Sequence, residues 1–392
     1  MTDPERILPL WKELESAAAD YVLATIVAVE GSSYRRPGAC MLLAPDGRRA
    51  GTVSGGCLEG EVAKRALWLT ENGPVIHRYS TAEEDGERPY GSGCGGVIWL
   101  LLERRPTAGP LLHALEQAFH RRIPLAVATI LEGEQLGRRA FAGLDHPGSL
   151  LSSENPLQEL AERTLLNRSP INETVVFARV PARAWTDFRP ARPGLWIFGA
   201  GDDAQPLVRL AKELGWFVTV ADGRSQLVTR QRFPLADGLH VLRVKELPTP
   251  ADDGSAAAFA HLLPHDAAVA MTHSFEQDSR VLASLLALDQ SLAYIGVLGP
   301  QRRTRELLTE AAQLLGREAT SAADTLAWID HQLAQLHAPT GLDLGAESPE
   351  TVALSVIAEI LKSFTAATAL PLRVVRATAP ASVAEPSLKS LG

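Results

Sequence analysis

One glycine-rich turn, set between a strand pattern and a helix pattern, constrains the fold of this chain more than any other feature. The run LWIFGA at 195–200 is apolar and typical of a buried strand, and DAQPLVRLAKELG at 203–215 has the periodicity of an amphipathic helix. Further strands are expected at 216–222 and near 238–243, 266–272 and 292–297, with helices between them. Strands that alternate with helices imply a parallel, doubly wound sheet, so the predicted fold class is α/β.

The turn itself has the pattern of a nucleotide-binding turn. The six residues GAGDDA, which begin with Gly199, Ala200 and Gly201, fit GxGxxG/A in a Rossmann-like context. In that pattern the glycines let the backbone approach a pyrophosphate, and the helix N-terminus attracts it. Asp222, at the end of the next strand, is at the distance expected for an acceptor of ribose hydroxyls, and Arg224 could meet an extra phosphate.

Two acidic residues oppose this interpretation. Asp202 and Asp203 place negative charge at the helix end where an anion would bind. They suit the helix dipole and a helix cap, but they would repel a diphosphate. The alternative is a Rossmann-like domain that has lost its nucleotide.

Two further places lie at predicted strand ends, where doubly wound sheets bind ligands. His273 follows a strand in MTHSFEQD, and Gly296 and Gly299 precede Arg302 in YIGVLGPQRRTRELL. An arginine near a helix start could hold a phosphate. The alternatives are a structural histidine and a solvated helix face.

A loop near residue 57 offers a thiol beside glycines. Cys57 follows Ser54, Gly55 and Gly56 in GTVSGGCLEG, and a helix is predicted over 58–69. Backbone amides of such a loop can form an anion nest, and a thiol at a helix N-terminus has a lowered pKa. A buried thiol in a tight turn is the alternative.

The three cysteines argue against a disulfide framework or a zinc site, because their number is odd and no CxxC pair is present. Cys94, in GSGCGG, is a second thiol in a glycine loop, for which a structural role is the alternative. Cys40 lies in a predicted strand and is expected in the core. Thiols that stay reduced indicate a cytoplasmic protein.

The N-terminal part is expected to be an α+β unit, residues 1–185, joined through the Pro- and Arg-rich stretch 182–194 to a Rossmann-like domain at 190–370. Residues 371–392 are expected to be a disordered tail. In the N-terminal unit, helices are predicted at 5–19, 58–69, 110–121 and 155–167, and strands at 21–30, 40–45, 48–54, 74–80, 96–103 and 124–131.

The net charge of -8 argues against a nucleic-acid or membrane-surface binder, which needs clustered Lys and Arg. The chain shows neither a signal-peptide pattern nor an apolar run long enough for a membrane span. No Ser-His-Asp order, HExxH or Walker A pattern is present, so the sequence assigns no catalytic residue.

Taken together, several ordered motifs resemble the XdhC/CoxI family. They are GSSYRRPGACMLLAPDGRRAGTVSGGCLEGEV, GCGG, LWIFGAGDDAQPL, MTHSFEQD, YIGVLGPQRRT and GLDLGAESPETVALSVIAEIL, spread over residues 10–365. The resemblance implies an accessory factor without turnover of its own. Such a factor binds the molybdenum cofactor, as molybdopterin or its cytosine dinucleotide, helps its sulfuration and inserts it into a molybdenum hydroxylase of the xanthine, aldehyde or carbon monoxide dehydrogenase type.

The resemblance also implies partners and roles for residues. The partners would be an apo-molybdenum hydroxylase, a cysteine desulfurase, a cofactor cytidylyltransferase and a second copy of the chain. Cys57 and Glu59 fall in the SGGCLEG motif, where Cys57 is the candidate contact for molybdenum or sulfur. Asp202 stands where many members carry histidine, which puts the mode of ligand binding in question.

Two other functions stay open. An NAD(P)-dependent oxidoreductase would use the GxGxxA turn and Asp222, but the sequence shows no acid–base set for hydride transfer. A scaffold with an empty Rossmann pocket would bridge a desulfurase and an apo-hydroxylase, and the acidic pair in the turn favours it.

Overall fold

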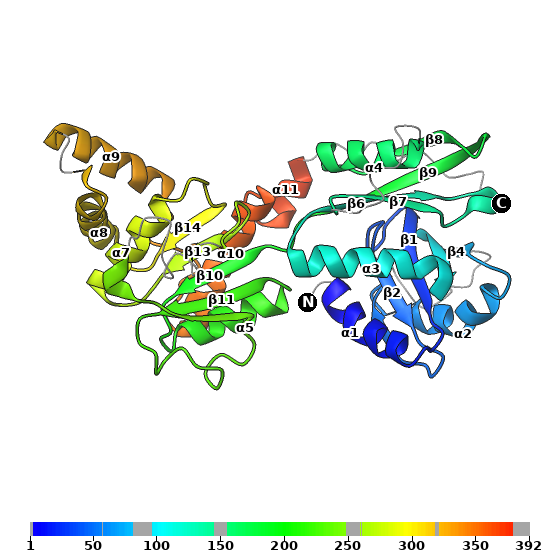
Figure 1. Cartoon of the computed structure of the whole chain (residues 1–392), viewed down its shortest axis with the longest axis horizontal. Helices are drawn as coiled ribbons and strands as arrows, with labels where there is room; N and C mark the ends of the chain where they lie inside the picture. Colours follow the sequence, from blue (N-terminus) through cyan, green and yellow to red (C-terminus); the bar gives the residue numbers. More distant parts are fainter. Residues whose placement is uncertain are drawn as a thin grey trace. The chain divides into compact units, whose positions relative to one another are not determined.

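The chain divides after Arg192 into two compact units, residues 2–192 and 193–379 (Figure 1). A computed structural model describes residues 3–56, 58–80, 96–144, 155–247, 259, 261–317 and 321–378. Within these ranges, no helix is both long enough and apolar enough to cross a membrane.

The N-terminal unit contains two antiparallel sheets. The first has the strand order β3-β2-β1-β5-β4, and the second has the order β7-β6-β9-β8. The elements are α1 (Asp3–Ser16), β1 (Val22–Glu30), β2 (Cys40–Leu43), β3 (Arg49–Gly51), α2 (Glu59–Leu69), β4 (Val75–Ser80), β5 (Val97–Arg104), α3 (Arg105–Arg121), β6 (Leu125–Ile130), η2 (Gly133–Gln135), β7 (Arg139–Ala142), α4 (Pro156–Asn167), β8 (Asn172–Phe177) and β9 (Val180–Arg189).

Helices cover both faces of the first sheet. Successive side chains of a strand point to opposite faces, and in β1 Leu23 packs with residues of α1 and α3 while Ala24 and Ile26 pack with residues of α2. Because both faces are covered, β1 is almost wholly apolar rather than alternating. Helix α4 covers the second sheet.

The C-terminal unit is a parallel sheet with the order β12-β11-β10-β13-β14, which confirms the predicted α/β fold class. Helices α5 and α10 pack on one face and α7 on the other. Its elements are β10 (Gly194–Phe198), α5 (Ala204–Glu213), β11 (Phe217–Asp222), β12 (Gly238–Val241), η3 (Val244–Glu246), β13 (Ala267–Ala270), α7 (Phe275–Leu286), β14 (Tyr294–Val297), α8 (Gln301–Leu314), α9 (Ala322–Gln335), α10 (Pro349–Thr365) and α11 (Leu372–Thr378).

The strand order fixes where a ligand would bind. The chain passes from β10 outward through β11 and β12, then returns to β13 on the other side of β10. In such sheets the crevice beyond the carboxyl ends of the two strands at this switch point is the usual binding place. The candidate residues of this unit therefore have to be judged at the carboxyl edge of β10, β11, β13 and β14.

Two stretches differ from the sequence-based expectation. Residues 182–189 of the predicted linker belong to β9, because Ala184 and Trp185 are buried between β6 and β8. Residues 372–378 of the predicted tail form α11, whose first turn is closed by the Pro371 carbonyl accepting from Val374 N. Residues 379–392 lie outside the described residues.

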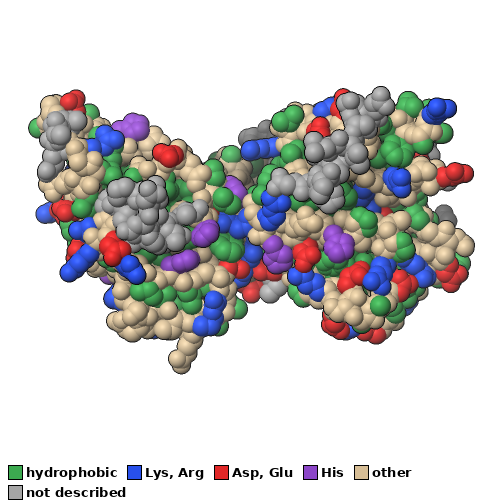
Figure 2. All heavy atoms as spheres, in the orientation of Figure 1, with side chains coloured by type: hydrophobic (Ala, Val, Ile, Leu, Met, Phe, Trp, Pro, Cys, Tyr) green, Lys and Arg blue, Asp and Glu red, His purple; other side chains and the backbone are tan. Residues whose placement is uncertain are grey.

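On the face of each unit drawn in Figure 2, acidic and basic side chains are mixed rather than gathered by sign.

Candidate functional site

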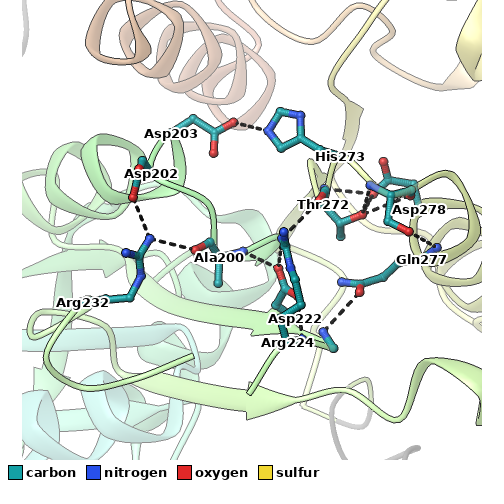
Figure 3. Close-up of polar contacts among 12 residues, drawn as sticks. Ala200, Asp202, Asp203, Asp222, Arg224, Arg232, Thr272, His273, Gln277 and Asp278 are labelled. Carbon is teal, nitrogen blue, oxygen red and sulfur yellow. Dashed lines mark hydrogen bonds and ion pairs between the residues drawn. The ribbon is translucent and has the colours of Figure 1, made fainter. Parts of the chain in front are cut away.

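Asp222, at the end of β11, is occupied within the protein. Its carboxylate accepts hydrogen bonds from Ala200 N at 2.8 Å and from Arg224 N, Nε and Nη2 at 2.9, 3.0 and 2.7 Å (Figure 3). Burial would raise the pKa of Asp222, but these donors outweigh burial and lower it. A carboxylate with about four acceptor sites is then saturated. The fully buried group does not fit the predicted role of accepting ribose hydroxyls.

The turn after β10 needs its first glycine for packing. Gly199 has φ +138°, and a Cβ there would lie 2.4 Å from the Met271 carbonyl oxygen at the end of β13. Gly201 differs, because a Cβ there would meet Asp203 Oδ1 at 2.5 Å, which is the end of a side chain that can move. The two glycines of the motif therefore have different tasks.

Gly199→Ala is expected to lower the free energy of unfolding of the C-terminal unit by about 1–3 kcal/mol, the usual effect of overpacking. Gly201→Ala should cost less than about 1 kcal/mol, because only a side chain has to move. Urea unfolding of the two variants, followed by circular dichroism, checks the order. Equal losses would contradict the different tasks of the two glycines.

The acidic residues of the turn are both paired. Asp202 Oδ1 lies 2.8 Å from Arg232 Nη2, which also donates to the Ala200 carbonyl. Asp203 Oδ2 lies 2.8 Å from His273 Nε2 and joins the start of α5 to the end of β13 (Figure 3). His273 has φ +62°, an uncommon conformation for a residue with a side chain.

A hollow of about 220 Å³ lies at the carboxyl ends of β13 and β14. It is lined by Met271, His273, Asp278, Leu298, Gly299 and Arg303. Buried Asp278 accepts from Thr272 N at 3.0 Å and from Arg303 Nη2 at 2.6 Å. These bonds, with Arg303 Nη1 donating to the Leu298 carbonyl, fix the guanidinium against the wall of the hollow.

Arg303, rather than Arg302, is the arginine that lines this hollow. The Arg302 side chain is 91% exposed and pairs with Glu306 one turn along α8. Adjacent residues on a helix point about 100° apart, so a sequence motif with several arginines does not show which one faces the sheet. Arg303 is the one that faces the sheet, because it pairs with the buried carboxylate of Asp278.

Gly296 and Gly299, which the sequence placed together at a candidate site, have different positions in the structure. Gly299, with φ +115°, lines the hollow and turns the chain into α8. Gly296 lies inside β14, where a Cβ would meet Thr340 Oγ1 at 2.6 Å. Gly296 therefore serves packing against the following segment and not the hollow.

Sequence reasoning missed Gln277 and Glu359. Gln277 is 6% exposed, its Oε1 accepts from Gly223 N, and its Nε2 has no hydrogen-bond partner among the described residues. Glu359 accepts from Tyr294 Oη and Gly341 N, both at 2.7 Å, and so fixes the loop that follows residues 337–340 beside β14. A carboxylate within the apolar run of α10 was the available signal for Glu359.

In the N-terminal unit, Glu59 locks the glycine loop from inside. It is 3% exposed and accepts from Ser54 N at 2.8 Å, from Ser54 Oγ and from Thr52 Oγ1. Burial would raise the pKa of Glu59, but these hydrogen bonds outweigh it and lower the pKa to about 2. Glu59 therefore fits a structural strut better than a free cofactor ligand.

The predicted anion nest is partly filled. Ser54 Oγ accepts from Gly56 N at 3.2 Å and from Leu58 N at 3.1 Å, so these amides already have an acceptor. Gly55 and Gly56 are exposed, and a Cβ on Gly55 would lie 3.7 Å from the Tyr34 ring. The loop thus presents glycine backbone and an exposed tyrosine to solvent.

Cys57 and Cys94 lie outside the described residues. Cys40 is buried, as predicted, and burial raises the pKa of its thiol. Among the described residues, His, Cys, Asp and Glu side chains do not form a group of three that could hold a metal ion.

Comparisons with known proteins extend over nearly the whole chain. The XdhC and CoxI family matches residues 14–80, and the XdhC Rossmann domain matches residues 195–360. A Bacillus subtilis (strain 168) protein, named as a probable xanthine dehydrogenase subunit, is 33% identical over 346 residues, 87% of this chain and 92% of the relative. An Escherichia coli (strain K12) protein named molybdenum cofactor insertion chaperone PaoD is 26% identical over 370 residues, 92% of this chain and 89% of the relative.

A solved structure also matches nearly the whole chain. The crystal structure of a protein described as a xanthine dehydrogenase, from Bacillus halodurans, matches 96% of this chain and 100% of that one, with a TM-score of 0.64 and 26% identity. The matches to both units and to full-length relatives agree with the motifs found in the sequence. The chain therefore belongs to the XdhC and CoxI family.

Proposed function

We propose that this protein is a chaperone that binds the molybdenum cofactor and assists its sulfuration and insertion into a molybdenum hydroxylase of the xanthine, aldehyde or carbon monoxide dehydrogenase type. One observation carries the proposal: 92% of the chain matches a relative named molybdenum cofactor insertion chaperone. The name of the Bacillus subtilis relative supports a xanthine dehydrogenase as the client class. We place this function in the cytoplasm.

The geometry of the C-terminal unit supports binding rather than turnover. An NAD(P)-dependent oxidoreductase needs an acceptor for the ribose at the end of the second strand, and the Asp222 carboxylate there already accepts four hydrogen bonds. The hollow offers Arg303 and His273, two side chains suited to a phosphate. Molybdopterin ends in a phosphate, so we assign this end of the cargo to the hollow.

The N-terminal unit would contribute the thiol chemistry. Cys57 remains the candidate contact for molybdenum or its terminal sulfur, and Cys94 is a second candidate. Support comes from the neighbours of Cys57: Glu59 and Ser54 hold the loop in a defined shape, while Gly55 and Gly56 keep it open to solvent. A cysteine desulfurase, a cofactor cytidylyltransferase and a second copy of the chain are the further partners we propose.

A scaffold that binds no cofactor is the second candidate. It is favoured by the internal pairing of Asp202 with Arg232, Asp203 with His273 and Asp222 with Arg224, which gives each carboxylate of the turn a partner within the protein. Bound pterin separates the two candidates.

The test is cofactor retention after purification from a molybdate-fed host that makes the cofactor. Molybdenum is measured by mass spectrometry and pterin by fluorescence after oxidation. Wild type should carry both, and Arg303→Gln should carry at least about tenfold less, the equivalent of 1.4 kcal/mol of lost binding. Arg302→Gln is the matched control and should equal wild type, because Arg302 points to solvent.

Two more variants complete this test. Arg303→Lys keeps a charge beside buried Asp278 but loses the planar fork, so a retained fold with reduced pterin separates binding from stability. Cys57→Ala should lower molybdenum or its sulfuration without changing the fold. Wild type that carries neither molybdenum nor pterin would exclude the chaperone role and leave the scaffold, and a titration with NADH would examine the oxidoreductase alternative.

A further inference from the structure

The side chain of Asp203 fills the space that Gly201 leaves open. A Cβ built on Gly201 would lie 2.5 Å from Asp203 Oδ1, so the carboxylate rests directly against this glycine. In nucleotide-binding turns of this pattern, the second glycine is small so that a pyrophosphate can approach the backbone. The Asp203 carboxylate thus stands where a pyrophosphate would lie.

Asp203 is held in this position from the other side of the switch point. Its Oδ2 lies 2.8 Å from His273 Nε2, and Figure 3 shows the imidazole turned toward the carboxylate. His273 reaches it from a backbone with φ +62°, which side-chain-bearing residues adopt only when their surroundings fix it. The Asp203 side chain is only 20% exposed. The contact with His273 therefore holds the Asp203 carboxylate at the turn.

A backbone donor of the turn is also already in use. Ala200 N, an amide that could bind a pyrophosphate oxygen, donates to buried Asp222 at 2.8 Å. Asp202 pairs with Arg232 and its side chain points to solvent, so it is not part of this obstruction. A diphosphate placed here would meet the Asp203 carboxylate and would find the Ala200 amide already bonded, so both charge and hydrogen bonding oppose it.

The hollow at α8 differs, because the carboxylate in its lining, Asp278, is buried and paired with Arg303. The first turn of α8 contains no acidic residue, Pro300 supplies no side-chain cap, and Arg303 lies on the wall. Its volume of about 220 Å³ is below the roughly 300–1,000 Å³ of pockets that enclose drug-sized ligands. This space suits a single phosphate with its adjoining atoms, and the rest of a ligand would lie outside it.

We infer that Asp203 is a specificity-determining residue: it makes this domain accept a ligand that ends in one phosphate and refuse one that ends in a diphosphate-linked nucleotide. The inference rests on the proposed function, and within it the cargo is molybdopterin itself rather than its cytosine dinucleotide. Asp203 acts by occupying the diphosphate position with a carboxylate of its own.

The test compares CMP and CDP, which differ by one phosphate, in equilibrium binding to the full chain. Wild type should bind CDP no more tightly than CMP. Asp203→Ala should raise the affinity for CDP at least tenfold and leave that for CMP within about threefold. Asp203→Ser, which keeps a good helix N-cap residue, should behave in the same way and exclude an effect of helix stability.

Asp202→Ala is the matched control, because it removes the same charge from the neighbouring position, where the side chain is 87% exposed. Its affinity for CDP should stay within about threefold of wild type. Wild type that binds CDP tenfold more tightly than CMP, or Asp203 variants with unchanged CDP affinity, would overturn the inference.

The cargo distinguishes a failure here from a failure of the proposed function. Cofactor that co-purifies with wild type is hydrolysed and examined for cytidine. Pterin and molybdenum without cytidine agree with the inference. Pterin and molybdenum with stoichiometric cytidine would overturn it and leave the chaperone role intact, whereas absent pterin together with CDP binding by Asp203→Ala would overturn only the chaperone role.

Discussion

Glu103→Ala is expected to lower the free energy of unfolding of the N-terminal unit by about 3–5 kcal/mol, the usual result of removing one partner of a buried ion pair. Glu103 and Arg139 have side chains that are 0% and 4% exposed. Without the carboxylate, the guanidinium of Arg139 would be a buried charge with no counter-ion. Urea unfolding measures the loss, and hydrogen–deuterium exchange assigns it to peptides of this unit.

The size of this effect follows from how completely the pair is enclosed. Both oxygens of Glu103 accept from Arg139, whose Nη1 also donates to the carbonyls of Thr107 and Gly137 at 3.1 Å. Gly137, with φ +82°, leaves room for the pair, since a Cβ there would lie 2.7 Å from Glu103 Oε1. Both backbone carbonyls and the missing side chain of Gly137 therefore accommodate the Glu103–Arg139 pair.

Two further variants show whether the loss of stability comes from the charge of Glu103, from its volume, or from an effect that any ion pair at the surface would give. Glu103→Gln keeps the shape but removes the charge, and it should still lose most of the stability. Glu173→Ala breaks the pair with Arg163, in which the side chains of Arg163 and Glu173 are 45% and 35% exposed, and should cost less than about 1 kcal/mol. A loss for Glu103→Ala as small as that of Glu173→Ala would show that water reaches Arg139.

Local sequence pattern was sufficient for much of the fold. The apolar run of β1 and the switch to helical periodicity after Gly201 mark elements whose chemistry is contained in a few neighbouring residues. The division after Arg192 falls within the predicted stretch 182–194, but residues 182–189 belong to β9, because Pro and Arg in this stretch concealed the consecutive buried residues 184–187. Whether a strand is central depends on partners distant in sequence, and composition does not show them.

The candidate site was less accessible to sequence reasoning, because the partner of each charge decides its role. Asp222 and Arg224 were correctly placed at a strand end, but they bind each other. Arg302 and Arg303 are equivalent in the sequence and differ only through Asp278, which lies on another helix. A motif therefore locates the edge of a site, and only the fold shows which groups remain free to bind a ligand.

Both glycine turns follow the same physical principle. In the turn after β10, Ala200 N is satisfied by Asp222, and in the loop before α2, Leu58 N is satisfied by Ser54 Oγ. Each turn is therefore preorganised by an internal oxygen acceptor instead of by a ligand. A preformed loop loses less entropy on binding, which suits the uptake and release of a ligand that the proposed function requires.

Glu59→Gln is expected to remove an acid-sensitive part of the stability of the glycine loop. The pKa of Glu59 is about 2 in the folded chain against an ordinary 4.5, and this difference corresponds to about 3 kcal/mol. Because the folded-state pKa is lowered, the stabilisation is complete above the unfolded pKa and is lost as the pH falls toward about 2. The free energy of unfolding of wild type should exceed that of Glu59→Gln by about 3 kcal/mol near neutral pH. This difference, the gap, should close below about pH 5.

Urea unfolding of wild type and Glu59→Gln at a series of pH values measures this gap, and hydrogen–deuterium exchange over α2 locates it. Glu61→Gln is the matched control two residues along the same helix, where Glu61 pairs with Arg65 at the surface, and its effect should stay below about 1 kcal/mol. A gap that persists unchanged at low pH would mean that shape, not charge, gives Glu59 its role. A gap that closes as expected means that the ionised carboxylate sets the shape of the loop through Ser54, and this group stays ionised throughout the physiological range.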